Sequence, residues 1–137
     1  MSVVEELIRL ERNGEISFGN YKLPEKAKLD DFAANGDLYK VKTCKEMTKL
    51  EKNGSFLYES VPGTTVTALD YKENGVRFTV EGDQAAQVIL ELEDGAEYDI
   101  TINGENAGTM ATSMGGKITL SVELSEDEQS AVIIEKK

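Results

Sequence analysis

The dipeptide Asn-Gly occurs five times in this chain and constrains the fold more than any other feature of the sequence. It stands at Asn13-Gly14, Asn35-Gly36, Asn53-Gly54, Asn74-Gly75 and Asn103-Gly104, and so takes up five of the seven asparagines. A two-residue type I′ turn needs positive φ at both central positions, which Gly adopts freely and Asn tolerates. Asn-Gly between apolar runs is therefore the strongest short-range hairpin signal. The sequence predicts a series of β-hairpins.

Apolar and polar residues alternate after residue 65, as they do in strands with one buried face. This pattern predicts strands at 67–71, 76–80, 88–92, 98–102, 106–112, 118–124 and 132–134. Short strands with a turn signal every 8 to 12 residues, roughly, are typical of a β-sandwich. We expect an all-β protein, with an antiparallel Ig-like or jelly-roll-like sandwich in residues 65–137.

The first part of the chain, residues 1–64, is predicted to form further hairpins. Residues 9–14 and 49–54 share the order basic, Leu, Glu, basic, Asn, Gly, which suggests two similar hairpins. A helix over residues 3–12 is the alternative, because Val4, Leu7, Ile8 and Glu11 also fit the apolar stripe of a helix. Short apolar runs do not separate these two interpretations.

A composition shift predicts a boundary at residues 61–65, where Pro62 and Gly63 interrupt the chain. Residues 1–64 hold 10 basic and 11 acidic side chains, whereas residues 65–137 hold 5 and 15. Six of the nine aromatic residues belong to the first region. We expect two regions, 1–64 and 65–137, and the sequence leaves open whether they share one core.

Composition excludes several kinds of chemistry and of partner. The chain of 137 residues contains no histidine, so it lacks the commonest metal ligand and the usual general base, and we expect no metal and no cofactor. A net charge of -11 opposes binding to nucleic-acid phosphates or to an anionic membrane. No apolar segment reads as a signal peptide or a membrane span, so a cytoplasmic location is expected.

The remaining candidates for a catalytic nucleophile or a catalytic acid fit structural roles better. Cys44 has Lys42 and Lys45 nearby to lower its pKa but no histidine as a base, and a free cysteine is usually a small buried hydrophobe. Carboxylate pairs such as Asp30-Asp31 could suit a glycosidase only if they flanked a cleft. Solvated surface is the more common role of such pairs.

Two groups of residues are candidates for ligand binding. Lys40 and Lys42 share one face of a predicted strand and could receive an anionic ligand, or could protect an edge strand from pairing. Tyr21, Tyr39 and Tyr58 could stack on sugar rings, with core packing as the alternative. The chain has no tryptophan, the usual best platform for such stacking.

Residues 16–21, 36–43, 50–54 and 58–64 resemble a family of short proteins from gut Firmicutes whose members are often labelled endosialidase. The label implies a glycosidase that acts on sialic acid. Sialidases use an arginine triad, a tyrosine nucleophile and a large propeller with repeated Trp-containing boxes. This chain has only Arg9, Arg12 and Arg77, no tryptophan, and too few residues for several four-stranded blades.

A second resemblance concerns residues 98–104, Gly108, Thr112, Gly115-Gly116 and 120–124. These are similar to small β-sandwich modules of bacterial carbohydrate-active and surface proteins, which implies the same architecture and a glycan ligand. Because no nucleophile, base and oxyanion donor stand at recognisable spacing, we predict a non-enzymatic binding or scaffolding protein. A carbohydrate-binding module is the first alternative, and a glycosidase is the second.

Self-association is the expected form of partnership, with another protein or a glycan as further partners. Hairpins in residues 1–64 expose strand edges and carry aromatic residues that so short a region scarcely buries alone. Residues 65–137 would repel one another if juxtaposed, which makes the first region the expected contact surface. A symmetric homodimer is the commonest closed arrangement.

Overall fold

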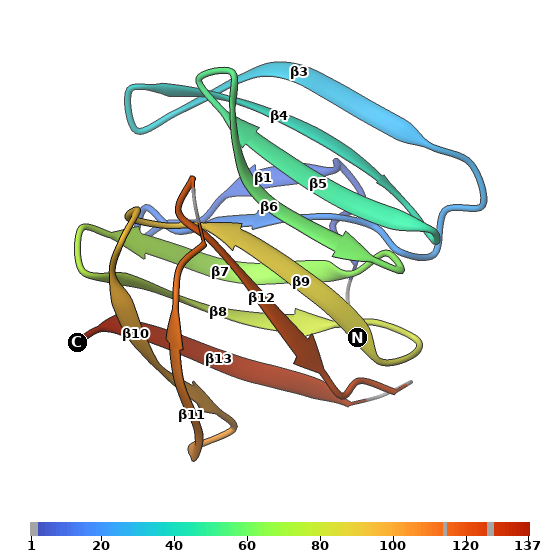
Figure 1. The fold of residues 1–137 in the computed structure, drawn as a ribbon. Coiled ribbons are helices and arrows are strands. Elements are labelled where there is room, and N and C mark those ends of the chain that lie inside the picture. The colour runs from blue at the N-terminus through green and yellow to red at the C-terminus, as the bar shows by residue number, and fades with distance from the viewer. Residues whose placement is uncertain (1–2, 114, 126–127) are drawn as a thin grey trace.

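The computed structural model describes residues 3–113, 115–125 and 128–137, which form strands and turns without any helix. In this part of the chain, thirteen strands make two antiparallel sheets, one of seven strands and one of six, as Figure 1 shows. The prediction of an all-β fold with an antiparallel sandwich is confirmed, and the sandwich includes strands from residues 1–64 as well as from 65–137.

We call the seven-stranded sheet A and the six-stranded sheet B. Sheet A has the order β1-β2-β7-β8-β13-β10-β11. Its strands are β1 (Ile8–Leu10), β2 (Ile16–Phe18), β7 (Thr65–Lys72), β8 (Gly75–Glu81), β13 (Gln129–Lys136), β10 (Glu97–Ile102) and β11 (Glu105–Ala111). Sheet B has the order β12-β9-β6-β5-β4-β3. Its strands are β12 (Lys117–Val122), β9 (Ala86–Glu91), β6 (Ser55–Val61), β5 (Met47–Lys52), β4 (Asp37–Cys44) and β3 (Ala27–Ala34).

Each Asn-Gly dipeptide joins two strands that pair with each other, namely β1–β2, β3–β4, β5–β6, β7–β8 and β10–β11. At Asn35-Gly36 both residues have positive φ, 52° and 83°, as a type I′ turn requires. The dipeptides at 53–54 and 103–104 are alike. At 13–14 and 74–75 only the glycine has positive φ, so these two hairpins are formed with another kind of turn.

The helical alternative for residues 3–12 is wrong. The segment makes a turn and then the short strand β1, which pairs with β2. Leu7 has a φ of 76°, which a helix does not allow. The Val4 amide donates to the Gly19 carbonyl at 3.1 Å, and the Gly19 amide donates to the Leu7 carbonyl at 2.9 Å. Pairing with a neighbouring strand thus satisfies backbone groups that a helix would satisfy internally.

The predicted boundary at residues 61–65 is the place where the chain leaves sheet B and enters sheet A. β6 ends there in sheet B, and β7 begins in sheet A. Strands from regions 1–64 and 65–137 occur in both sheets, and one hydrophobic cluster contains buried residues of both regions. The two regions therefore share a single core.

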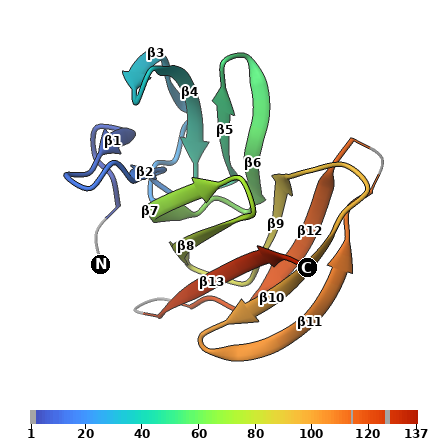
Figure 2. The ribbon, with the colours of Figure 1, turned by 90° about the vertical axis from the view of Figure 1, so that its left-hand side faces the viewer.

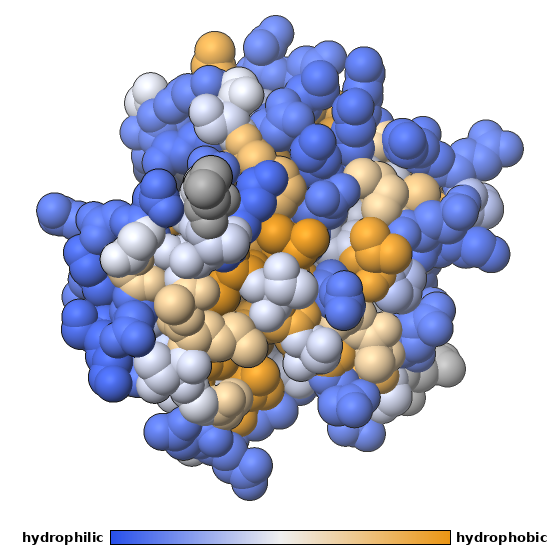
Figure 3. Space-filling model, in the orientation of Figure 1, coloured by the Kyte–Doolittle hydropathy of each residue, from blue (hydrophilic) through white to orange (hydrophobic). Residues whose placement is uncertain are grey.

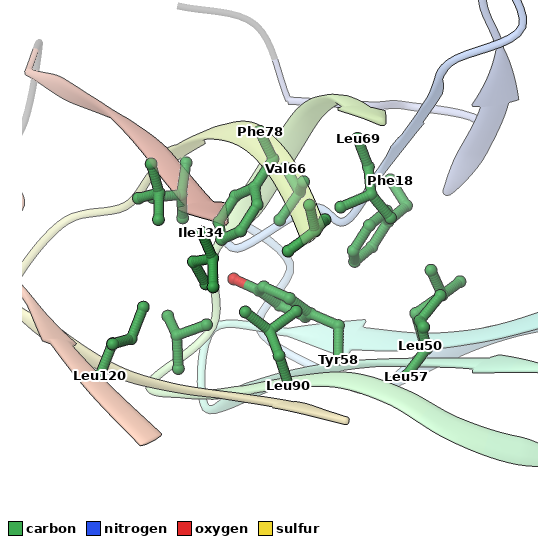
Figure 4. Packing of buried hydrophobic residues seen from close by; sticks show 14 of the residues in the cluster. Phe18, Leu50, Leu57, Tyr58, Val66, Leu69, Phe78, Leu90, Leu120 and Ile134 are labelled. Carbon is green, nitrogen blue, oxygen red and sulfur yellow. The ribbon is translucent and has the colours of Figure 1, made fainter. Parts of the chain in front are cut away.

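Tyr58 lies at the centre of that core, as Figure 4 shows. Its ring makes edge-to-face contacts with Phe18 and Phe78, with ring centres 5.2 and 5.9 Å away. Phe18 and Phe78 belong to sheet A and Tyr58 to sheet B, so this aromatic group joins the two layers. Such pairs stabilise by about 0.5–1.5 kcal/mol beyond the area they bury.

Hydrogen bonds made by buried hydroxyl groups connect Tyr58 with Thr43 at one end of sheet B. The Tyr58 hydroxyl and the Ser60 hydroxyl each lie 2.8 Å from Thr64 Oγ1. Thr48 Oγ1 donates to the Thr64 carbonyl at 2.7 Å and lies 2.8 Å from Thr43 Oγ1. Every member is almost fully buried and has a partner, which is the condition for a buried polar group to stabilise a fold.

Candidate functional site

Three lysines stand side by side on the outer face of sheet B. The register places Lys28 of β3 opposite Lys42 of β4, and Lys42 opposite Lys49 of β5. Like charges directly opposite one another destabilise a sheet by roughly 0.2–1 kcal/mol for each pair. We call Lys28, Lys42 and Lys49 the lysine row.

The members of the lysine row differ in how far they are neutralised. Lys49 has its ammonium 3.5 Å from the Glu51 carboxylate. Within the described ranges, no acidic side chain forms an ion pair with Lys28 or Lys42. Lys28 and Lys42 are therefore the two members of the row whose charge no ion pair in the described structure compensates.

Lys40 and Lys42 occupy the same face of β4, as the alternation predicts, but their surroundings differ. Lys40 faces Glu51 across the strand pair, and its ammonium lies 3.9 Å from Asp30. Asp30 belongs to a bulge of β3, where Asp31 has a φ of 56°. Of the two predicted lysines, Lys42 is the one free to bind an anion.

An apolar area adjoins the lysine row on the same face. Val61 is 57% exposed, and Ile89 and Phe56 are half-buried. Figure 3 shows apolar surface in the region of β6, β9 and β12, surrounded by hydrophilic surface. The Lys117 ammonium lies 4.8 Å from the centre of the Phe56 ring and adds a cation at the rim. The outer face of sheet B thus combines exposed hydrophobic side chains with charged ones, and Glu59 lies between Lys49 and Ile89.

The three predicted tyrosines do not form a common surface. Tyr58 is fully buried in the core. Tyr39, near the beginning of β4, is 7% exposed, and burial raises its pKa, with a smaller contribution from the Asp37 charge. Tyr21 is 6% exposed and lies beyond β2, near the other end of β4, where the neighbouring Asn20 amide donates to Thr43. The separation and burial of the rings leave no flat aromatic platform for a sugar.

A groove of about 170 Å³ lies near the hairpin turns and holds acidic groups that sequence analysis did not select. Asp37 and Tyr71 are among its lining residues. The Asn53 side-chain amide donates to Asp37 at 2.9 Å and, with the Lys52 ammonium at 3.6 Å, lowers the pKa of Asp37. Burial raises the pKa of Tyr71 to about 12, helped by the nearby Tyr98 and Glu91. Asp37 is therefore ionised and cannot serve as a general acid near neutral pH.

Asp70 is the second carboxylate of this groove. Its carboxylate lies 3.5 Å from the Lys72 ammonium and 3.8 Å from Arg77 Nε. Glycoside hydrolysis needs one protonated carboxyl group and one ionised carboxylate. Asp37 is held in the ionised form, and Asp70 forms ion pairs with two cations.

Cys44 is 3% exposed at the end of β4, which is the position of a small core residue. Glu81 is the unusual buried acid: it is 4% exposed, and its Oε1 has no hydrogen-bond partner in the described structure. Burial raises its pKa, and the charge of Lys22 opposes this effect. In the described residues, no group of three or more metal-ligating side chains is close enough to hold an ion.

No family model, curated protein or solved structure matches this chain. The function is therefore inferred from the outer face of sheet B. The sequence indicates Lys40, Lys42 and Lys49 as parts of a basic strip there, but it does not single out Lys28, Val61 or Ile89. Their proximity depends on strand register, which the sequence does not display. Among the described residues there is no helix long and apolar enough to cross a membrane.

Proposed function

We propose that this chain is a non-enzymatic binding or scaffolding protein that binds an acidic protein surface with the outer face of sheet B. The lysine row carries the proposal. Three lysines in register across three strands oppose folding. A bound anionic partner would compensate that cost, which gives the arrangement a function in the complex that it lacks in the free chain.

The apolar area supports a protein partner over a small anion. Val61 and Ile89 supply hydrophobic contact beside the charged residues. An apolar centre with a charged rim is the usual anatomy of a protein interface, whereas a small anion would gain nothing from the apolar side chains.

A second copy of this chain has the complementary charge. Residues 65–137 contain 15 acidic and only 5 basic side chains. Contact between the lysine row of one copy and the acidic region of another avoids the repulsion that two acidic regions would produce. We therefore propose self-association, with Lys28 and Lys42 of the lysine row supplying the positive side.

An enzyme and a carbohydrate-binding module have less support. The two carboxylates of the groove, Asp37 and Asp70, are both ion-paired, and the predicted tyrosines are buried in separate places. A screen of sialidase and other glycosidase substrates should show no turnover. Turnover that disappeared on Asp37→Asn or Asp70→Asn would refute the proposal.

Light scattering at micromolar concentration and low salt tests the proposed self-association. We expect a mass above the monomer value of 15.0 kDa that decreases toward it at high salt. Lys42→Thr should shift the equilibrium toward monomer more than Lys40→Thr, although both variants lose one positive charge. A monomer mass for the native chain at every salt concentration would contradict the proposal.

A further inference from the structure

The two sheets differ in extent on the side where β11 and β12 lie. Sheet A ends with β11, and sheet B ends with β12. All residues of β11 are exposed, including Met110 at 38%, so neither face of this strand is covered. The two strands do not pair and diverge from their connection, as Figure 1 shows, and Figure 2 places the β10–β11 hairpin on the outside of the sandwich. Among the described residues, sheet B ends at β12 and has no strand opposite β11.

The free edge of β12 has backbone groups in position for another strand. The Leu92 amide donates to the Gly116 carbonyl at 2.7 Å, so the backbone carbonyl of Gly116 points toward β9. The direction of the backbone groups alternates along an antiparallel strand. The backbone amides and carbonyls of Lys117, Thr119 and Ser121 therefore point away from β9. The Lys117 carbonyl accepts from the Ser113 amide at 2.9 Å, in agreement with this direction. In the structure as described, no hydrogen bond reaches the backbone of Thr119 or Ser121.

The other three sheet edges are protected against pairing. β1 has only three residues. β3 is interrupted by a bulge between Leu29 and Phe32. β11 has a bulge next to Gly108, whose φ is 106°. β12 instead pairs with β9 over its whole length without a register shift, and short strands and bulges are the usual means of blocking an edge.

We propose that β12 accepts an extended segment of a partner protein as an added antiparallel strand of sheet B. The occupant is one strand wide. In each copy, sheet A already covers Ile118, Leu120 and Val122 of β12. If the β12 strand of a second copy paired with this edge, the sheet A of that copy would meet the projecting β11 of the first copy. A single segment would cover the inward face of β11, including Met110, while pairing with Thr119 and Ser121.

Charge and alternation define the segment further. Lys117 at the beginning of β12 and Glu123 just after its end are both exposed and point to the same face as Thr119 and Ser121. An antiparallel partner therefore has a basic residue beside Glu123 at its N-terminal end and an acidic residue beside Lys117 at its C-terminal end. Between them, apolar side chains alternate with polar ones, the apolar ones on the side of Leu120.

The synthetic peptide Lys-Val-Thr-Val-Thr-Val-Glu has this pattern and serves as the probe. In amide hydrogen exchange followed by NMR, we expect it to protect the Thr119 and Ser121 amides. The peptide Glu-Val-Thr-Val-Thr-Val-Lys has the same composition with the charges reversed, and it should bind roughly threefold to tenfold more weakly because two exposed ion pairs become repulsive. Absence of protection at millimolar peptide would overturn the proposal, as would equal binding of both peptides.

Thr119→Pro separates edge pairing from binding elsewhere. The Thr119 amide points outward, so proline removes no bond to β9 but blocks the added strand. Binding should be lost in this variant and retained in Thr119→Val, with both variants showing native spectra for β9. Peptide binding that survives Thr119→Pro would refute the edge site. Protection of Thr119 and Ser121 without peptide that is lost on dilution would assign the edge to a second copy and also refute it.

Discussion

Replacing Lys42 with Thr should make the monomer more stable. In the native chain Lys42 lies between Lys28 and Lys49, and in the described structure it has no ion pair. Each directly opposed like pair costs roughly 0.2–1 kcal/mol, so removing both should stabilise by about 1 kcal/mol. For a domain of this size, that corresponds to a rise of about 4 °C in Tm. Threonine is a good strand former, which limits other effects of the change.

Lys40→Thr is the matched control. It makes the same chemical change on the same strand, but Lys40 has Asp30 and Glu51 as acidic neighbours. Its removal should leave the stability unchanged or reduce it by up to about 1 kcal/mol. The difference between the two variants therefore reports the neighbours of each lysine and not the net charge of the chain.

Urea unfolding at dilute protein concentration is the suitable assay, because self-association would add a concentration-dependent contribution to the apparent stability. The measurement should be made at low salt and at about 1 M salt, where screening reduces the Debye length to about 3 Å. We expect the gain of Lys42→Thr to shrink at high salt. If Lys42→Thr destabilises the monomer as much as Lys40→Thr does, the argument that the lysine row opposes folding is wrong.

Three further predictions concern a core tyrosine, the buried acid and a turn glycine. Tyr58→Phe removes the hydroxyl that lies 2.8 Å from Thr64 Oγ1 and should lower the free energy of unfolding by about 1 kcal/mol in urea, whereas an unchanged value would show that this contact contributes nothing. Glu81→Gln should raise the urea midpoint at pH 7 and have little effect near pH 4. Burial raises the pKa of Glu81 in the native protein above its ordinary value of 4.5. The native protein therefore loses stability as the pH rises above 4.5, because the unfolded chain ionises Glu81 more readily. An equal effect of Glu81→Gln on the urea midpoint at both pH values would contradict this reasoning. Gly116→Ala should destabilise the protein by about 2 kcal/mol or more in thermal unfolding, because Gly116 has a φ of 80° and an added Cβ would clash with the Leu92 carbonyl. Gly36 has a similar φ of 83° but open space around it, so Gly36→Ala should destabilise the protein less.

The sequence by itself determined the hairpins and the strands. At 35–36, 53–54 and 103–104 Asn-Gly specifies a tight turn through the φ preferences of both residues, and all five dipeptides lie between two paired strands. Alternation with period two located the seven strands after residue 65 and placed Lys40 and Lys42 on one face. These are local properties, because turn geometry and side-chain direction depend on residues that are near in the chain.

Only the tertiary structure decided which strands are neighbours and which side chains are buried. Residues 1–64 and 65–137 differ in composition but share both sheets and one core, because the sandwich is completed only when β1 and β2 join β7, and β6 joins β9. Lys28, Lys42 and Lys49 come together through the register of three strands. The free edge of β12 exists because sheet B ends where sheet A continues. Pairing between distant strands is selected by the apolar area that the whole chain buries, so no local pattern displays it.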